Sequence, residues 1–214
     1  MAATTARGQL RLPAWLLAAL LLLVTIVVYW PATSYEFVNY DDHLHVTRNL
    51  QVQSGLTWEG MGWAFLNPVN CNWHPLTVWS HMLDCQLFGL RPWGHHLTSV
   101  LLHAVNAMLV FALLQQMTGA RWRSLLVAAL FSLHPLRVES VAWVAERKDV
   151  LSGCFGLLAL IFYARYAEGQ RQQAEGRGPR SLFNLPSPGF YLLSLLLYAL
   201  GLMSKPMLVT WPFL

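Results

Sequence analysis

The chain has 214 residues, of which 56% are hydrophobic and only 11% are charged. An ordinary soluble domain carries roughly 25% charged residues. Because the apolar residues also gather in long blocks, the composition indicates an all-α integral membrane protein. The formal net charge of +4 reflects where basic residues stand around the expected membrane spans, and it gives no case for a nucleic-acid partner.

Five apolar segments, taken in chain order, predict transmembrane helices, since a helix needs about 20 apolar residues to cross a bilayer. They are Leu12–Trp30, Leu97–Met117, Ser124–Leu136, Val150–Tyr166 and Phe190–Met203. The third and fifth are short, so they must be tilted, kinked or shielded by neighbouring helices. The first is better explained as an uncleaved anchor than as a signal peptide, because its apolar core is long and ends in Tyr29-Trp30. The last apolar run stops abruptly at Leu214, which suggests a truncated piece of a larger membrane protein.

Basic residues near the span ends predict the orientation. With a cytoplasmic N-terminus, eight of the fourteen Lys and Arg fall in cytoplasmic segments, and the first outer segment carries five acids against two bases. The expected organisation is a cytoplasmic N-terminus (1–11), a first span (12–30), an outer loop with amphipathic helices (31–96), spans two to four with an outer interfacial helix (97–167), a cytoplasmic linker (168–188), and a fifth span followed by the start of a further segment (189–214).

Two adjacent carboxylates, Asp41 and Asp42, follow the first span in the stretch "VNYDD". We refer to these two residues as the acidic pair. They repel each other, and no basic residue stands next to them. One interpretation is a solvated turn. The other is that the pair faces a cation, a phosphate carrier or a proton to be abstracted.

A second group of polar residues lies between the third and fourth spans, in "HPLRVESVAWVAERKD". Its apolar residues recur at helical spacing, which predicts an interfacial helix anchored by Trp143. That helix is either a simple amphipathic connector or a support for a site. In the second case His134 and Glu139 face a cavity shared with the acidic pair, and Arg147 and Lys148 offer positive charge to a phosphate.

The histidines do not favour a metal site, because no pair has a tight spacing such as His-x-x-x-His. His103 and Asn106, one turn apart in the second span, are expected to make structural hydrogen bonds. The sequence contains no Gly-rich phosphate loop, no Gly-x-Ser-x-Gly and no His-Glu-x-x-His. Nucleotide hydrolysis and the common hydrolase chemistries therefore have no support.

Four segments carry a resemblance to a known family: "YDDHLHVTRNLQVQSGLTWEG", "NWHPLTVWSHMLDCQLFGLRPWGHHL", "LFSLHPLRVESVAWVAERKDVLS" and "LMSKPMLVTWPFL". They resemble the membrane half of the transmembrane, tetratricopeptide-repeat (TPR) proteins related to protein O-mannosyltransferases, together with their bacterial relatives. The resemblance covers nearly everything from Tyr35 to Leu214 except the linker. It implies a GT-C-like glycosyltransferase fold in the bacterial inner membrane or the endoplasmic reticulum.

The resemblance also implies a reaction. A sugar moves from a polyprenyl- or dolichyl-phosphate carrier to an acceptor hydroxyl on a protein or glycan. Asp41 and Asp42 match the first-loop acidic motif, which would supply a base or hold a divalent metal. His134 and Glu139 match the His-Pro…Glu loop, and Lys148 and Lys205 match candidates for the carrier phosphate. A carboxylate near the acceptor proton and cations near the leaving phosphate fit this transfer.

Two other classes of function remain as alternatives. The chain could belong to a non-catalytic membrane scaffold whose repeats bind partners, although carboxylates and lysines expected on one face argue against that. A transporter would need ionisable residues deep in several spans, and only His103 is clearly placed so.

Overall fold

The computed structural model describes residues 12–175 and 187–213, and within these ranges the chain is helical, without a strand. The longer helices are α1 (Ala14–Tyr29), α3 (Trp58–Leu66), α4 (Pro75–Phe88), α5 (Pro92–Thr118), α6 (Arg121–Leu133), α8 (Arg147–Ala174) and α9 (Ser187–Ser204). Short elements connect them: η1 (Trp30–Ser34), η2 (His43–Thr47), α2 (Leu50–Gln53), η3 (Pro135–Arg137), α7 (Val138–Ala142), η4 (Val144–Glu146) and η5 (Pro206–Phe213). The expectation of an all-α membrane protein is confirmed.

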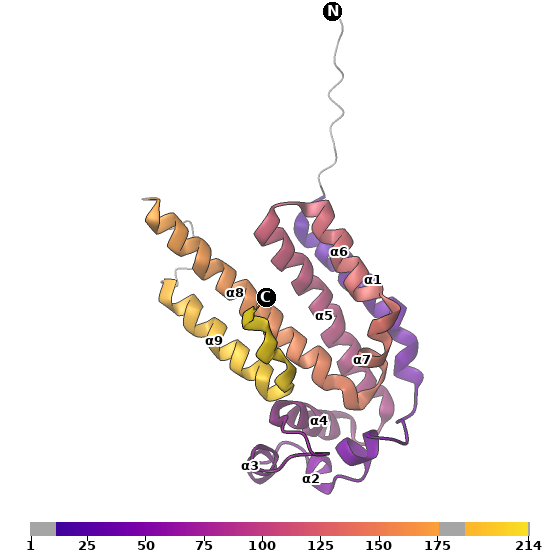
Figure 1. The fold of residues 1–214 in the computed structure, drawn as a ribbon. Helices are drawn as coiled ribbons and strands as arrows, with labels where there is room; N and C mark the ends of the chain where they lie inside the picture. The colour runs from indigo at the N-terminus through magenta and orange to yellow at the C-terminus, as the bar shows by residue number, and fades with distance from the viewer. Residues whose placement is uncertain (1–11, 176–186, 214) are drawn as a thin grey trace, which may run out of the picture.

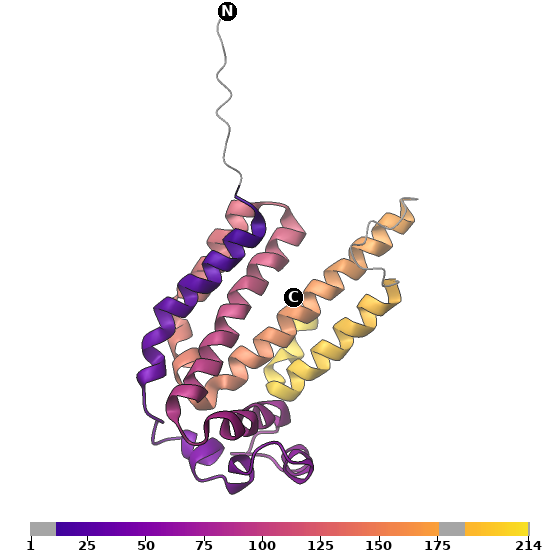
Figure 2. The ribbon, with the colours of Figure 1, turned by 180° about the vertical axis from the view of Figure 1, so that it is seen from behind.

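Helix α5 runs through the middle of the bundle (Figures 1 and 2), with α1 and α6 on one side and α8 and α9 on the other. A proline in its first turn and Gly119 at its C-terminal cap, with φ 66°, set its ends, because proline suits a first turn and glycine tolerates a left-handed cap. Two apolar clusters hold the neighbours in place. Leu17, Leu21, Ala107, Phe111 and Ala128 join α1, α5 and α6, and Leu113, Leu157 and Ile161 join α5 to α8.

Three helical segments are long and apolar enough to cross a membrane: Ala14–Ser34, Pro92–Thr118 and Val144–Ala174. The third expected span corresponds to Arg121–Leu133 and Pro135–Ala142, two helical pieces bent by 54°, and counting them as one span gives four. The fifth expected span corresponds to α9, a shorter apolar helix. The bend follows from Pro135, because proline lacks the N–H that a continuous helix requires.

Helix α8 continues to Ala174, so the first residues of the expected linker are helical. Arg171 and Glu175 form an ion pair one turn apart at 3.0 Å, which is typical support for the end of an exposed helix. The remainder of that linker, residues 176–186, lies outside the described residues.

The outer loop folds into a layer that contains the helices α2 to α4 and lies across one end of the bundle (Figure 1). Its apolar interior contains Val46, Val52, Ala64 and Met82, all at most 1% exposed. Val144, which comes from the segment between α7 and α8, belongs to the same cluster. The outer loop and the 134–149 segment therefore share one core.

The 134–149 segment is not one continuous interfacial helix. It forms η3, α7 and η4, and the backbone is extended at Trp143, with φ −92° and ψ 120°. This break turns the chain so that Val144 and Ala145, both fully buried, face the outer-loop layer. Burial of these two residues therefore prevails over the helical periodicity of the segment.

Candidate active site

Asp42 lies inside the protein, fully buried between the outer loop and the 134–149 segment. Its Oδ2 accepts a hydrogen bond from the backbone N–H of Val38, and its Oδ1 accepts one from the backbone N–H of Ala145, both at 2.8 Å. Burial raises the pKa of the Asp42 carboxyl above its ordinary value, and the two backbone donors and His96 act in the opposite direction. Asp42 is therefore a positioning group and not a solvated turn residue.

Asp41 is half-buried beside it, and its Oδ1 accepts a hydrogen bond from the side-chain amide of Asn70 at 3.1 Å. Asn70 and Cys71 have positive φ angles, 49° and 60°, and a short turn closed between Val69 and Asn72 holds them. Residues other than glycine rarely adopt this backbone conformation. The turn directs the side-chain amide of Asn70 toward Asp41. Of the acidic pair, Asp41 is the one that solvent or substrate can reach.

The acidic pair does not fit a shared metal ion. Both oxygens of Asp42 already accept backbone N–H groups, and its side chain has no exposed surface. Within the described residues, no third His, Cys, Asp or Glu ligand atom gathers with the pair to complete a site around an ion. We therefore derive no catalytic step through a metal bound by Asp41 and Asp42.

Two lysines from distant parts of the chain meet at Glu146, the residue that follows Ala145. Lys148, in the first turn of α8, forms an ion pair with Glu146 at 2.8 Å. Lys205, just after α9, lies 3.6 Å from the other oxygen of Glu146 and also contacts Asp149. The lysine side chains are 16% and 25% exposed, so the carboxylates hold two ammonium groups side by side within reach of solvent.

The end of α9 is fastened so that Lys205 reaches this cluster. Thr77 of α4 donates a hydrogen bond to the carbonyl oxygen of Ser204 at 2.9 Å, and both residues are fully buried. Ser140 of α7 donates to Asp149 at 3.0 Å. The lysine cluster (Glu146, Lys148, Asp149 and Lys205) is thus tied to both α4 and α7.

Arg147 points away from this cluster into the protein, although it precedes Lys148 directly. It is fully buried and pairs with Asp84 of α4 at 2.5 Å. Its remaining donors reach Ser80, Ser99 and the carbonyl oxygen of His95. The expected role at a phosphate does not fit this placement, because every face of the guanidinium is already bonded, and we leave Arg147 out of the phosphate site.

The structure does not join His134 or Glu139 to the acidic pair. Both are exposed, and His134 Nδ1 accepts a hydrogen bond from Leu136 N in its own turn. Within the described ranges no hydrogen bond or ion pair links either residue to Asp41 or Asp42. The connection runs instead through Ala145 and through the Tyr40 and Trp143 rings, whose centroids are 6.0 Å apart.

Reasoning from the sequence missed Glu146 and Asp149. The run Glu146-Arg147-Lys148-Asp149 alternates acids and bases, which is a usable signal for ion pairs around a helix start. It does not show which cation turns inward. His103 and Asn106 do make the expected structural hydrogen bonds, to the carbonyl oxygens of Ser132 at 2.9 Å and Val150 at 2.7 Å.

Comparison with known proteins identifies relatives of one kind. The chain is 30% identical over 198 residues to protein O-mannosyl-transferase Tmtc2 of Drosophila melanogaster, and this match covers 87% of the chain and 20% of that protein. It is 31% identical over 198 residues to protein O-mannosyl-transferase TMTC1 of Mus musculus, covering 88% of the chain and 20% of that protein. Over 95 residues, 44% of the chain and 11% of the relative, it is 38% identical to Tmtc1 of Drosophila melanogaster.

The chain thus spans about a fifth of the length of the curated relatives that it matches over most of its own length. No family model matches the chain. No solved structure matches it either. By these sequence relationships the chain is a homologue of the TMTC proteins and belongs to the family of TMTC-type protein O-mannosyl-transferases.

Proposed function

We propose that this chain carries the reacting groups of a membrane O-mannosyltransferase that uses a polyprenyl- or dolichyl-phosphate mannose as its donor. The names of its relatives support mannose and a protein acceptor. The observation that carries the proposal is the hydrogen bond between Asp42 and Ala145. Ala145 directly precedes Glu146, and Glu146 pairs with both lysines.

In the proposed reaction, the oxygen of an acceptor Ser or Thr hydroxyl attacks the anomeric carbon of mannose. The bond between that carbon and the phosphate oxygen breaks, and the lipid phosphate leaves with the electron pair. The hydroxyl proton passes to the carboxylate of Asp41. Among the acidic pair Asp41 suits this role, because it is half-buried with one oxygen bonded to Asn70, whereas both oxygens of Asp42 are occupied.

Lys148 and Lys205 are the proposed partners of the leaving phosphate. A cation next to the position where negative charge develops stabilises the transition state. Glu146 and Asp149 keep the two ammonium groups close together before substrate arrives, since the lysines alone would repel each other. The proposed orientation puts this end of the bundle on the outer face and the N-terminus in the cytoplasm, because the outer loop is acidic and the opposite segments are basic.

The test uses the intact protein in vesicles, with dolichyl-phosphate mannose and an acceptor peptide. We expect Asp41→Asn to lower the transfer rate by about 10²–10⁴-fold, as for loss of a general base. Glu59→Gln removes another exposed carboxylate of the outer loop and should transfer at the parent rate. Transfer by Asp41→Asn at the parent rate would exclude Asp41 as the base, and unchanged transfer by Lys148→Met and Lys205→Met would exclude the phosphate site.

A further inference from the structure

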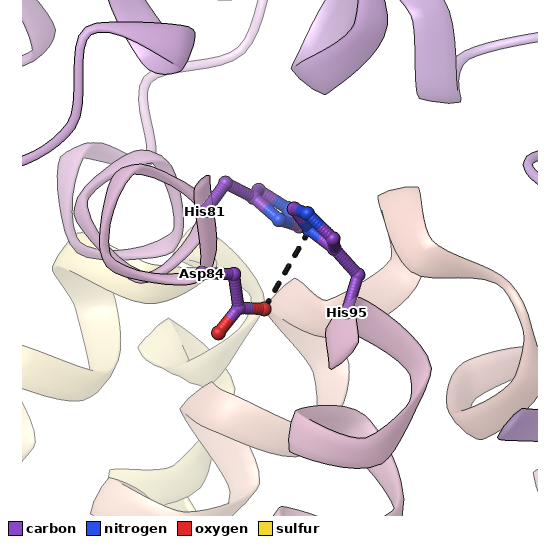
Figure 3. Close-up of side chains that lie close together, drawn as sticks. All are labelled: His81, Asp84 and His95. Carbon is purple, nitrogen blue, oxygen red and sulfur yellow. Dashed lines mark ion pairs between the residues drawn. The ribbon is translucent and has the colours of Figure 1, made fainter. Parts of the chain in front are cut away.

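Three buried side chains outside the proposed active site lie together where α4 meets α5. His81 and Asp84 are three residues apart on one face of α4, and His95 lies in the first turn of α5 (Figure 3). One ligand atom from each residue lies within 4.8 Å of the other two. Exposure is 0% for both histidines and 2% for Asp84.

The hydrogen bonds around the cluster orient the ring of His95. Its Nε2 lies 3.0 Å from the carbonyl oxygen of Gly89. A carbonyl can only accept, so Nε2 carries the proton and Nδ1 keeps its lone pair. That Nδ1 lies 3.6 Å from Asp84 Oδ2 and has no hydrogen-bond partner. This pattern, one ring nitrogen fixed by a carbonyl and the other directed at a shared point, is typical of a metal-bound histidine.

His81 has no hydrogen-bond partner at either ring nitrogen within the described part of the chain, although both atoms are buried. Figure 3 shows its ring beside that of His95, and the ring centroids are 6.4 Å apart. Buried polar atoms are nearly always satisfied, so an orphan of this kind indicates a water or an ion.

We propose that His81, Asp84 and His95 bind a divalent first-row metal ion, with zinc as the preferred ion. Two imidazoles and one carboxylate are ordinary zinc ligands, and three protein ligands leave a coordination position for water. The carboxylate has an outer-shell partner as well, because Thr98 donates to Asp84 Oδ1 at 2.8 Å. This site is separate from the acidic pair and does not depend on the proposed mannosyl transfer.

Arg147 is the charged group that opposes a cation here, since it pairs with Asp84 Oδ2. Its guanidinium is also held by the carbonyl oxygen of His95 at 2.6 Å and by the hydroxyl and carbonyl oxygens of Ser80. These oxygens offset part of its positive charge, and Asp84 serves it as a counter-ion. A carboxylate that ligates a metal commonly has a further hydrogen-bonding partner of this kind.

A zinc ion at this position would fasten the outer-loop layer to the bundle. His81 and Asp84 belong to the layer, whereas His95 begins the helix that runs through the middle of the bundle. The same junction holds Arg147, whose neighbours Glu146 and Lys148 belong to the lysine cluster. The metal would therefore stabilise the platform on which the proposed active site stands.

Zinc content and cobalt spectra of the intact protein, purified in detergent, test the site. We expect about one zinc per chain for the parent and for His134→Ala, which removes an exposed histidine, and a loss of at least roughly tenfold in zinc affinity for His81→Gln and Asp84→Asn. Thr98→Val, which keeps side-chain shape and removes the outer-shell donor, should weaken binding by about 10–100-fold.

Cobalt in place of zinc reports the ligand set of the parent without any substitution, so the test holds even where a variant does not fold. We expect visible absorption bands of low-symmetry nitrogen and oxygen coordination and a zinc-dependent rise in the thermal midpoint of the parent. A parent that takes up neither metal overturns the proposal and leaves water as the partner of the histidines. Full zinc binding by folded His81→Gln also overturns it, as an adventitious ion elsewhere.

Discussion

The backbone N–H of Ala145 donates a hydrogen bond to Oδ1 of Asp42 at 2.8 Å, across 103 positions of sequence. The same carboxylate accepts the N–H of Val38 through its other oxygen. One buried side chain thus satisfies two backbone donors from two segments and fixes the outer loop against the start of α8. The acidic pair therefore combines a structural residue, Asp42, with a more accessible one, Asp41.

Asp42→Ala should destabilise the protein more than Asp41→Ala does. Removing Asp42 leaves two backbone N–H groups without acceptors in a buried place, at a cost of about 1–3 kcal/mol for each unsatisfied group. Asp41 is half-buried with one side-chain partner, so its removal should cost no more than about 1 kcal/mol. Thermal unfolding of the intact protein in detergent measures both. Equal thermal midpoints for the two variants would show that the Asp42 hydrogen bonds contribute nothing.

Arg147→Met should be strongly destabilising, because it leaves the buried carboxylate of Asp84 without its counter-ion. Breaking one partner of a buried pair costs roughly 3–5 kcal/mol. Arg171→Met is a matched control, since Arg171 pairs with Glu175 at the surface and is 81% exposed. Exposed pairs contribute about 0–1 kcal/mol. Chemical denaturation in detergent compares the two variants, and similar losses of stability would contradict the assignment of Arg147 to the interior.

That the acidic pair and the two lysines serve one site stays a prediction from topology, whereas the apolar spans could be predicted from the sequence, because they depend on local composition. The inward direction of Arg147 could not. It is adjacent to Lys148, and only the start of α8 decides which of the two faces Asp84. The break at Trp143 was equally hidden, since the apolar residues of that segment recur at helical spacing and their burial partners lie about 100 residues away.

The histidines illustrate the same limit. His81 and His95 are fourteen residues apart, which matches no short metal motif, and they meet only because α4 and α5 form a hairpin. Gly89 makes the turn with φ 63°, in a region that favours glycine. Gly94 lets α5 approach, because a Cβ at that position would lie 2.6 Å from the Cβ of Phe88. The close approach of the two helices thus depends on contacts that no spacing rule contains.

Stability should fall in mild acid because of His74, which is buried between the outer-loop helices. Burial first, then His45 and the Lys148 ammonium, lower the pKa of His74 to about 4, and His81 also lies near it. Between pH 6.5 and about 4 the unfolded chain takes up a proton that the folded chain refuses. The free energy of unfolding therefore decreases by about 1.4 kcal/mol per pH unit in that window from this residue. The contribution of neutral His74 to stability is fully present above pH 6.5.

His74→Gln removes this titration, so its stability should depend less steeply on pH than that of the parent. His134→Gln, at an exposed histidine, should keep the parent's slope. Burial and the Lys148 ammonium also lower the pKa of His45 to about 4. This second histidine contributes equally to both variants. Thermal midpoints at pH 7 and pH 5 measure the difference. A slope for His74→Gln equal to that of the parent would show that His74 is not buried in its neutral form.

The proposed orientation can be tested with a residue that the chain already contains. Cys71 is exposed in the outer loop, next to Asn70, which bonds to Asp41. A membrane-impermeant maleimide should therefore label Cys71 from the outer side of sealed vesicles of known orientation.

Gln170, exposed near the other end of α8, provides the opposite probe. In a Cys71→Ser background, Gln170→Cys should be labelled only after the vesicles are permeabilised. The helical segment Val144–Ala174, which comprises η4 and α8, is long enough to separate the two sides, since 31 residues at 1.5 Å each exceed the roughly 30 Å hydrocarbon core. Labelling of Gln170→Cys without permeabilisation, together with protection of Cys71, would place the acidic pair in the cytoplasm and remove it from a donor and acceptor presented at the outer face.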